Sequence, residues 1–146
     1  MHTLRNVIHR LDVVSATPSD TVFDVAIQMS RERVGAISIV EEDALVGIFS
    51  ERDLMTRVVV AGRDPRSTPV GEVMTHEVVT ADLDETVDAC LEKMRRADCR
   101  HLPVVQGSGA IAMLSMRDLL RDEVEEQTEE IQTLRAHLHQ SHQSPG

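Results

Sequence analysis

The sequence predicts an α+β protein made of two tandem β-α-β-β-α repeats with pseudo-two-fold symmetry, followed by a long C-terminal α-helix. Three observations predict this class. The chain matches itself at a shift of 65 residues, each copy combines helical apolar spacing with short apolar runs, and a heptad pattern continues beyond the second copy. A chain of 146 residues suits two small units that depend on each other for a core.

The internal repeat is the strongest pattern. Residues 14–55 align with residues 79–120 without a gap, and 11 of the 42 positions are identical, against roughly two or three by chance. We therefore divide the chain into repeat 1 (residues 1–61), a linker (62–69), repeat 2 (70–120), a C-terminal helix extension (121–140) and a disordered tail (141–146).

Each repeat opens with a short strand, at residues 13–16 and 78–81, and then a polar turn whose acids suit a helix N-terminus. A helix follows in each copy, because apolar residues recur at i, i+3, i+4 and i+7. These are Val22, Val25, Ala26 and Met29 in the first copy, and Val87, Cys90, Leu91 and Met94 in the second.

Two apolar runs come next in each copy and are typical of a strand, a tight turn and a second strand. They cover residues 36–40 and 45–49, and residues 102–105 and 110–114. A second helix is expected from Ser50 and from Ser115. Residues 70–74 predict a helical turn leading into repeat 2, and residues 1–10 the matching turn for repeat 1.

The final helix is expected from Met116 to about His139, because nothing in this stretch breaks a helix. A heptad seam runs along it through Leu120, Val124, Gln127, Ile131, Leu134 and Leu138. A small domain cannot cover so long a stripe, so we interpret it as a contact with the same helix of another subunit. The alternative is that the helix folds back on its own domain.

Composition excludes several classes. The chain has two Phe and no Tyr or Trp, which leaves no aromatic platform for bases, and its net charge of −10 argues against nucleic-acid binding. Residues 116–139 hold seven acids against three Arg, so clefts elsewhere can still be locally basic around Arg52, Arg100 and Arg117. No apolar run approaches a membrane span and no signal peptide opens the chain, so a cytoplasmic protein is expected.

Catalytic chemistry is not indicated. Cys90 and Cys99 are expected to be small buried hydrophobes in a reducing compartment. A metal site at His137, His139 and His142 is conceivable, but solvated side chains are favoured there because no carboxylate or Cys supports them. No phosphate-binding Gly-rich loop and no Ser-His-Asp order occurs. We therefore expect no catalytic residue, no metal site and no catalytic cofactor.

The chemical signal is a motif repeated where a strand ends and a helix begins, at residues 47–53 and 112–118. Helix capping alone explains a Ser followed three residues later by an acid. Two such elements beside one cleft at a repeat interface suggest more, since a helix N-terminus binds phosphate and a neighbouring carboxylate binds a ribose diol.

The two units resemble a pair of CBS domains, named for cystathionine β-synthase and together called a Bateman module. The resemblance rests on the repeated Gly-x-x-Ser-x-x-Asp pattern, on Arg-His-Leu-Pro-Val-Val at residues 100–105 and on Val-Met-Thr at residues 73–75, and it covers residues 4–120. It implies a regulatory signal-transduction module that binds an adenosyl ligand (AMP, ADP, ATP, NAD or S-adenosylmethionine) between the repeats of a homodimer. The acidic final helix resembles that of stand-alone bacterial CBS pairs.

The resemblance also implies two sets of ligand contacts. The ribose and phosphate set is Ser50, Arg52, Asp53, Arg100, His101, Ser115, Arg117 and Asp118, and the apolar adenine set is Ile37, Ile48, Leu102 and Met113.

The sequence departs from the family pattern at two places. Ala112 replaces the motif glycine of the second copy, and Gly35 and Ala36 stand where the second copy has Arg100 and His101. We therefore expect unequal clefts, with the better phosphate site at Asp118, beside Arg100 and His101.

Two other functions remain possible at this point. One is a structural or interaction dimer whose clefts no longer bind ligand. The less favoured one is an enzyme related to inosine monophosphate dehydrogenase, since that enzyme carries such a pair but needs a catalytic barrel of about 250 residues. The sequence names no regulated partner protein and indicates no nucleic acid or membrane partner.

Overall fold

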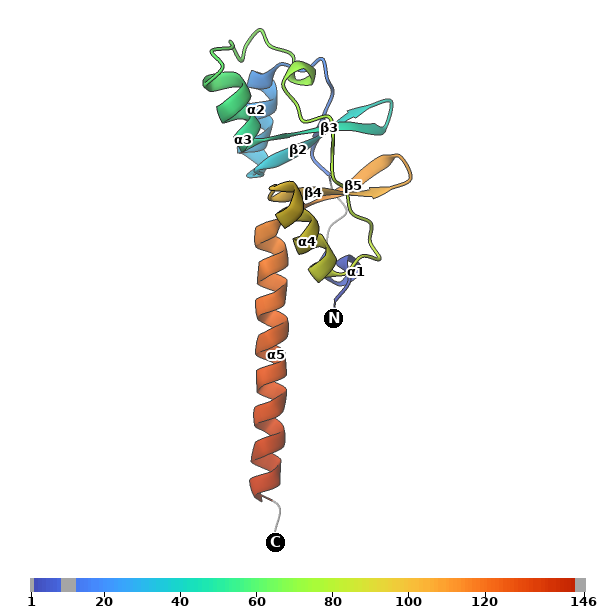
Figure 1. Cartoon of the computed structure of the whole chain (residues 1–146), viewed down its shortest axis with the longest axis vertical. Coiled ribbons are helices and arrows are strands. Elements are labelled where there is room, and N and C mark those ends of the chain that lie inside the picture. Colours follow the sequence, from blue (N-terminus) through green and yellow to red (C-terminus); the bar gives the residue numbers. More distant parts are fainter. Residues whose placement is uncertain (1, 9–12, 144–146) are drawn as a thin grey trace.

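The computed structural model describes residues 2–8 and 13–143. The first repeat contains β1 (Ser15–Ala16), α2 (Val22–Glu32), β2 (Ala36–Glu41), β3 (Ala44–Ser50), the short α3 (Glu51–Asp53) and the π-helix η1 (Leu54–Val59). The second contains α4 (Val87–Ala97), β4 (His101–Gln106), β5 (Gly109–Ser115) and α5 (Met116–Gln143). Figure 1 shows the two units stacked, which confirms the predicted α+β class with its long last helix.

The sheets are small. In the first repeat β1 pairs in parallel with β2, which pairs antiparallel with β3, whereas the second repeat has only the antiparallel pair β4 and β5. The strand expected at residues 78–81 is reduced to one parallel bridge between Ala81 and Val104. The reason is Pro103. Its counterpart Ser38 donates its N–H to the Val14 carbonyl across 3.4 Å, and a proline has no N–H to extend the ladder in this way.

Each repeat has its own apolar core. A segment that lies outside the strands and helices of that repeat contributes buried residues to the core. Two leading segments, residues 2–8 with α1 (Leu4–Val7) and residues 70–75 with η2 (Val70–Glu72), precede the first and second repeats. Val70, Val73 and Met74 are buried in the core of the first repeat. Leu4 is fully buried in the core of the second.

The leading segments are therefore exchanged, which differs from the expectation that each turn belongs to the repeat it precedes. Backbone hydrogen bonds hold each leading segment against the repeat whose core it fills. Val70 N–H donates to the Asp20 carbonyl at 2.7 Å, and Leu4 N–H donates to the Glu85 carbonyl at 3.0 Å.

The helix α5 projects away from both repeats, and only its first turns lie beside the rest of the molecule (Figure 1). Its 28 residues make it about 42 Å long. The apolar members of the heptad seam are 47% to 63% exposed, so the helix does not fold back on its own domain. It also includes residues 141–143 of the tail expected to be disordered, while residues 144–146 lie outside the described part. None of the helices in residues 2–8 and 13–143 has an apolar stretch that could span a lipid bilayer.

The exchange makes the N-terminal segment a structural part of the second repeat. We expect Leu4→Ala to lower the free energy of unfolding by about 2–5 kcal/mol, because it empties a closed apolar site. Denaturant unfolding measures this loss, and hydrogen exchange should show faster opening in β4 and β5 than in β2 and β3. Val60, an apolar residue that is 76% exposed, supplies the control Val60→Ala. A Leu4→Ala variant that loosens the first repeat instead would contradict the exchange.

Candidate functional site

A cleft of about 520 Å³ lies between the repeats. The first repeat contributes the end of β3 and the start of the helix after it, the second contributes the corner between α4 and β4, and the chain after η2 closes a third side. The cleft is lined by Gly35, Ile48, Ser50, Glu51, Arg52, Asp53, Met55, Thr56, Arg57, Thr75, Glu77, Val78, Val79, Ala97, Asp98, Cys99, Arg100 and His101.

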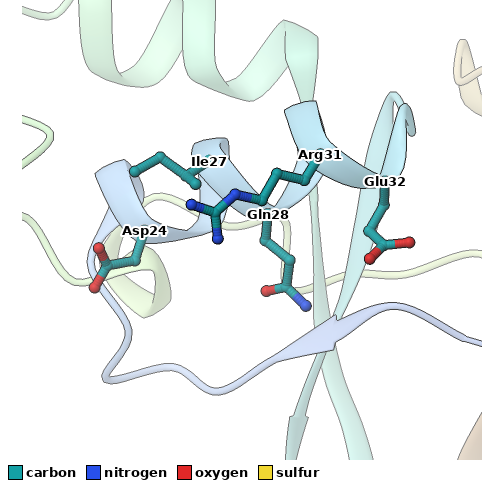
Figure 2. Close-up of a pocket in the computed structure, with 5 residues that line it drawn as sticks. All are labelled: Asp24, Ile27, Gln28, Arg31 and Glu32. Atoms are coloured by element: carbon teal, nitrogen blue, oxygen red, sulfur yellow. The ribbon is translucent and has the colours of Figure 1, made fainter.

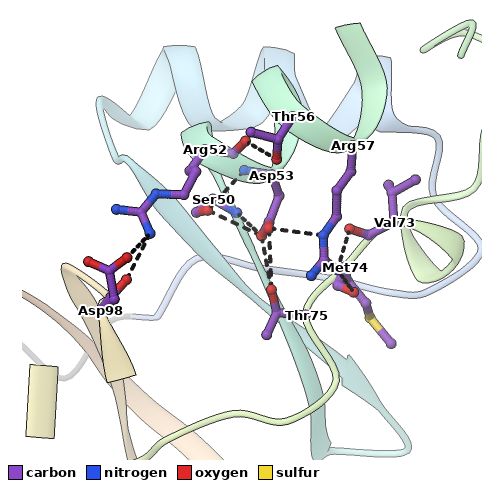
Figure 3. A network of polar contacts seen from close by, with 9 residues as sticks. All are labelled: Ser50, Arg52, Asp53, Thr56, Arg57, Val73, Met74, Thr75 and Asp98. Atoms are coloured by element: carbon purple, nitrogen blue, oxygen red, sulfur yellow. Dashed lines mark hydrogen bonds and ion pairs between the residues drawn. The ribbon is translucent and has the colours of Figure 1, made fainter. Parts of the chain in front are cut away.

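Asp53 is the central polar group of this cleft, with 7% of its surface exposed. Its Oδ2 accepts hydrogen bonds from the Ser50 N–H at 3.0 Å and the Ser50 hydroxyl at 3.1 Å. Thr75 Oγ1 lies 3.3 Å from both carboxylate oxygens, and Arg57 Nε lies 3.7 Å from Oδ1 (Figure 3). These donors compensate the burial of a charge that would otherwise be costly, and three of the four are side-chain groups that a ligand can displace.

Thr75 is held beside Asp53 by the backbone. Ile48 and Thr75 form an antiparallel bridge, with N–H to carbonyl distances of 3.0 and 2.8 Å. This close approach explains the motif glycine of the first repeat. A Cβ on Gly47 would lie 2.5 Å from the Met74 sulfur and 2.9 Å from the Thr75 carbonyl oxygen.

Three guanidinium groups line the cleft, and they differ in how far protein partners already occupy their hydrogen-bond donors. Arg52 crosses the repeat interface and donates from Nη1 to the Asp98 carbonyl at 2.7 Å, with the Asp98 carboxylate at 3.5 Å (Figure 3). Arg57 donates to the Met74 carbonyl at 2.9 Å. The exposed Arg100 side chain has no hydrogen-bond or ion-pair partner within residues 2–8 and 13–143, so it is free to meet an anion.

His101 enters the same cleft from the second repeat. Its ring lies against Gly35, where an added Cβ would be 3.1 Å from Cε1 and Nε2. Burial lowers the pKa of the imidazole below its usual 6.5, against the opposing influence of Glu51 and Asp118. The neutral form of the ring is therefore favoured at pH 7.

The apolar side of the cleft is formed by Ile48 together with Val78, Val79 and Met55. Cys99 also lines it, and burial raises the pKa of its thiol. Burial likewise raises the pKa of Cys90 to about 11. Both thiols are protonated at neutral pH, so neither has the thiolate character of a nucleophile.

The predicted polar residues divide between two places. Ser50, Arg52 and Asp53 line the described cleft, and Arg100 and His101 line it with them rather than a cleft with Asp118. Strand β4 starts at the repeat interface, which brings Arg100 and His101 into the cleft of Asp53, while Asp118 still influences the pKa of His101.

Ser115, Arg117 and Asp118 stand at the equivalent corner of the second repeat. Asp118 is exposed, and its backbone N–H donates to Ser115 Oγ at 3.1 Å. The Ser115 N–H also donates to Asp118 Oδ2 at 3.3 Å, as the Ser50 N–H does to Asp53. Within residues 2–8 and 13–143 the Asp118 carboxylate has no side-chain donor, whereas Asp53 has three.

The predicted apolar residues also divide. Ile48 lines the cleft, and Met113, its counterpart, is half-buried in the second repeat. Ile37 and Leu102 are fully buried in the two cores, so they have no surface to offer an adenine ring.

Sequence reasoning missed Arg57, Thr75, Val78 and Val79 as cleft residues. One signal was available for Arg57, because it lies four residues after Asp53 and therefore on the same helical face.

A second concavity, shown in Figure 2, lies on the outer face of α2, and Asp24, Ile27, Gln28, Arg31 and Glu32 line it. All five belong to one helix. The Gln28 side chain already has a structural partner, since its Nε2 donates to the Ser15 carbonyl at 3.2 Å. No motif residue reaches this surface, so the cross-repeat cleft is the candidate site.

The comparison with protein families decides the family. The model of the CBS domain matches the chain twice, at residues 4–60 and 70–125. This chain belongs to the CBS domain family. The two matches fall on the two repeats, so the molecule is a CBS pair, and the cleft lies between its two CBS domains.

Known CBS proteins resemble the chain over most of its length. The CBS domain-containing protein CBSX3 of Arabidopsis thaliana mitochondria is 38% identical over 84% of this chain and 62% of its own length. YhcV of Bacillus subtilis is 32% identical over 73% of this chain and 76% of its own. This CBS pair spans about three fifths of the first two curated relatives and about a fifth of the third.

Solved structures agree with this fold. A CBS domain crystal structure has a TM-score of 0.80 and 30% identity, covering 84% of this chain and 98% of that one. The CBS domain protein from Pyrobaculum aerophilum, solved in complex with AMP, has a TM-score of 0.72 and 27% identity, covering 80% and 89%.

The lowered pKa of His101 makes stability depend on pH. The folded state binds fewer protons at this site than the unfolded chain, so its contribution to stability is present above pH 6.5 and is lost as pH falls below it. The free energy of unfolding should fall less between pH 7.5 and pH 5.5 in His101→Gln than in the wild type. Denaturant titration at the two pH values measures this difference. His76→Gln, at an exposed position, is the control. Equal pH slopes for wild type and His101→Gln would contradict this assignment.

Proposed function

We propose that the cleft at Asp53 binds an adenosyl ligand with a phosphate group, of the AMP, ADP, ATP or NAD type, and that this CBS pair is a non-catalytic regulatory sensor. The observation that carries the proposal is the buried Asp53 carboxylate in a cleft that it shares with Arg100, whose side chain has no hydrogen-bond or ion-pair partner among the described residues. The known complex of the Pyrobaculum protein with AMP supports the ligand class.

The ribose fits Asp53. A carboxylate accepts hydrogen bonds from both hydroxyls of a diol, and charged acceptors make the stronger bonds. Ser50 and Thr75 now donate their hydroxyls to this carboxylate. Both hydroxyls can rotate and turn toward the ligand, while the Ser50 N–H keeps Asp53 in place.

We assign the adenine to the apolar lining of the cleft and the phosphate to its basic lining. Ile48, Val78 and Val79 form an apolar surface for a flat ring. Arg100 and His101 enter from β4, and a guanidinium matches the geometry of a phosphate.

A ligand in this position would change the contacts between the repeats. Arg52 joins α3 to the end of α4 through Asp98. A phosphate within its reach would compete with Asp98 for the guanidinium. Because both partners are exposed at 51% and 94%, the ion pair is weak, and a ligand can break it at little cost. We infer that loss of the Arg52–Asp98 contact on ligand binding changes the interface between the repeats.

We further propose that the signal acts through a homodimer. Met55 and Val59 in the first repeat are 56% and 67% exposed, and their repeat counterparts Leu120 and Val124 are 47% and 61% exposed. Matching apolar positions in both repeats favour a single face covered by a second copy, and the α5 seam extends this face.

Two alternatives make different predictions. A structural dimer with degenerate clefts would show no thermal shift with AMP, ATP, NAD or S-adenosylmethionine, whereas a binder is stabilised as ligand concentration exceeds Kd. An enzyme would turn over one of these nucleotides. Mass spectrometry of ligand released from the purified protein would identify the natural occupant.

We expect Asp53→Ala to weaken AMP binding about 10- to 100-fold, since it removes two charge-assisted hydrogen bonds to the ribose. Calorimetric titration measures this loss. The matched control is Asp118→Ala, which should change the affinity by less than about twofold because Asp118 does not line the cleft. Equal losses in the two variants would contradict the assignment of the site.

We expect the double variant Ile131→Asp/Leu134→Asp to raise the dimer dissociation constant at least tenfold, because it places charges on the apolar seam. Sedimentation equilibrium measures the change. Gln132→Asp, a nearby exposed position off the seam, should leave the dimer intact. A wild-type chain that is monomeric at high concentration, or a double variant that still dimerises, would contradict the proposed interface.

A further inference from the structure

A cluster of potential metal ligands joins the N-terminal leading segment to the first turns of α5. His2, Asp122 and Glu126 offer one ligand atom each, and these three atoms lie within 4.8 Å of one another. All three residues are half-buried. His2 comes from the N-terminal leading segment, and the two acids come from the first turns of α5, so their grouping depends on the exchange of the leading segments.

The spacing within the cluster suits one metal ion. His2 Nδ1 lies 3.1 and 3.2 Å from the two carboxylate oxygens of Asp122. Nitrogen and oxygen ligands bind zinc at about 2.0–2.2 Å, which puts two ligands of one tetrahedral ion roughly 3.3 Å apart. The imidazole and the carboxylate therefore already stand at the separation that a shared ion requires.

The backbone holds His2 in this position. Its carbonyl accepts the Val87 N–H at the start of α4 at 3.1 Å, and the next residue, Thr3, bridges to Thr86. Asp122 is also confined, since 13% of its side chain is exposed. Ligands fixed before binding lose little entropy when a metal arrives.

Charge is the second observation that points to a cation. Asp118, Asp122 and Glu126 follow one another at i, i+4 spacing on α5, where like charges repel. The first repeat has no such excess, because Arg57 stands at the position matching Asp122 and pairs with Asp53, and Ala61 matches Glu126.

We propose that His2, Asp122 and Glu126 form a site for a divalent transition-metal ion of the zinc type, which fastens the N-terminal segment to the base of α5. One imidazole and two carboxylates suit a borderline ion such as Zn²⁺ better than Mg²⁺, which prefers oxygen ligands alone. Three protein ligands leave a coordination position open for water. The ion would fix the direction in which α5 leaves the second repeat, and the site is separate from the Asp53 cleft.

The test uses the full-length chain without an added tag, cleared of metal with a chelator. Because His137, His139 and His142 could also bind zinc, the titrations use the background variant His137→Gln/His139→Gln/His142→Gln. Isothermal titration with ZnCl₂ should show one ion per chain, together with an increase in melting temperature. MgCl₂ at the same concentration should give neither signal.

Variants of the ligands then decide the proposal. In this background, His2→Gln, Asp122→Asn and Glu126→Gln should each weaken zinc binding at least tenfold and remove the thermal shift. Glu129→Gln, an exposed position on the same helix, is the matched control and should change neither. Circular dichroism of the metal-free variants shows that they fold. Zinc affinity that is unchanged in His2→Gln, or that is absent in the background variant, would overturn the site.

Discussion

The constraint on which this structure depends is the exchange of the two leading segments. Leu4 completes the core of the second repeat, while Val70, Val73 and Met74 complete the core of the first. Neither half holds all of its own apolar residues, so separation would expose a buried face on each. The two repeats therefore fold as one unit, and the interface between them is set by covalent connection as well as by surface contact.

Both polar clusters follow from this exchange. The segment that fills the first core continues into Thr75, which pairs with Ile48 and places a hydroxyl on the Asp53 carboxylate. The segment that fills the second core begins at His2, which it brings against Asp122. The same packing thus builds the cleft proposed to bind a phosphate beside one repeat and gathers acids with an imidazole beside the other. The two repeats are alike in fold, but their polar clusters differ in charge: Arg and His line the cleft, and two acids stand beside His2.

The sequence predicted what is local or repeated, and it failed where one repeat meets the other. Helical spacing and Ser50 capping identify α2, α4 and the Asp53 motif, because these interactions join residues a few positions apart. A shift of 65 residues shows which positions are equivalent, but not which repeat each side chain faces, so Arg100 and His101 were grouped with Asp118. The same limit hides the contact between His2 and Asp122, which are 120 residues apart. The effect of Pro103 on the strand expected at residues 78–81 was likewise not predicted.

The burial of Leu4 beside Leu119 in one core has a consequence for synthesis of the chain. These residues are separated by 115 positions, so the N-terminal segment leaves the ribosome roughly 6 to 23 seconds before its partner at usual rates of elongation. During that interval the first repeat can already close, since residues 70–75 follow it directly. Folding is thus ordered in time, and Leu4 stays without its core until the second repeat is nearly complete.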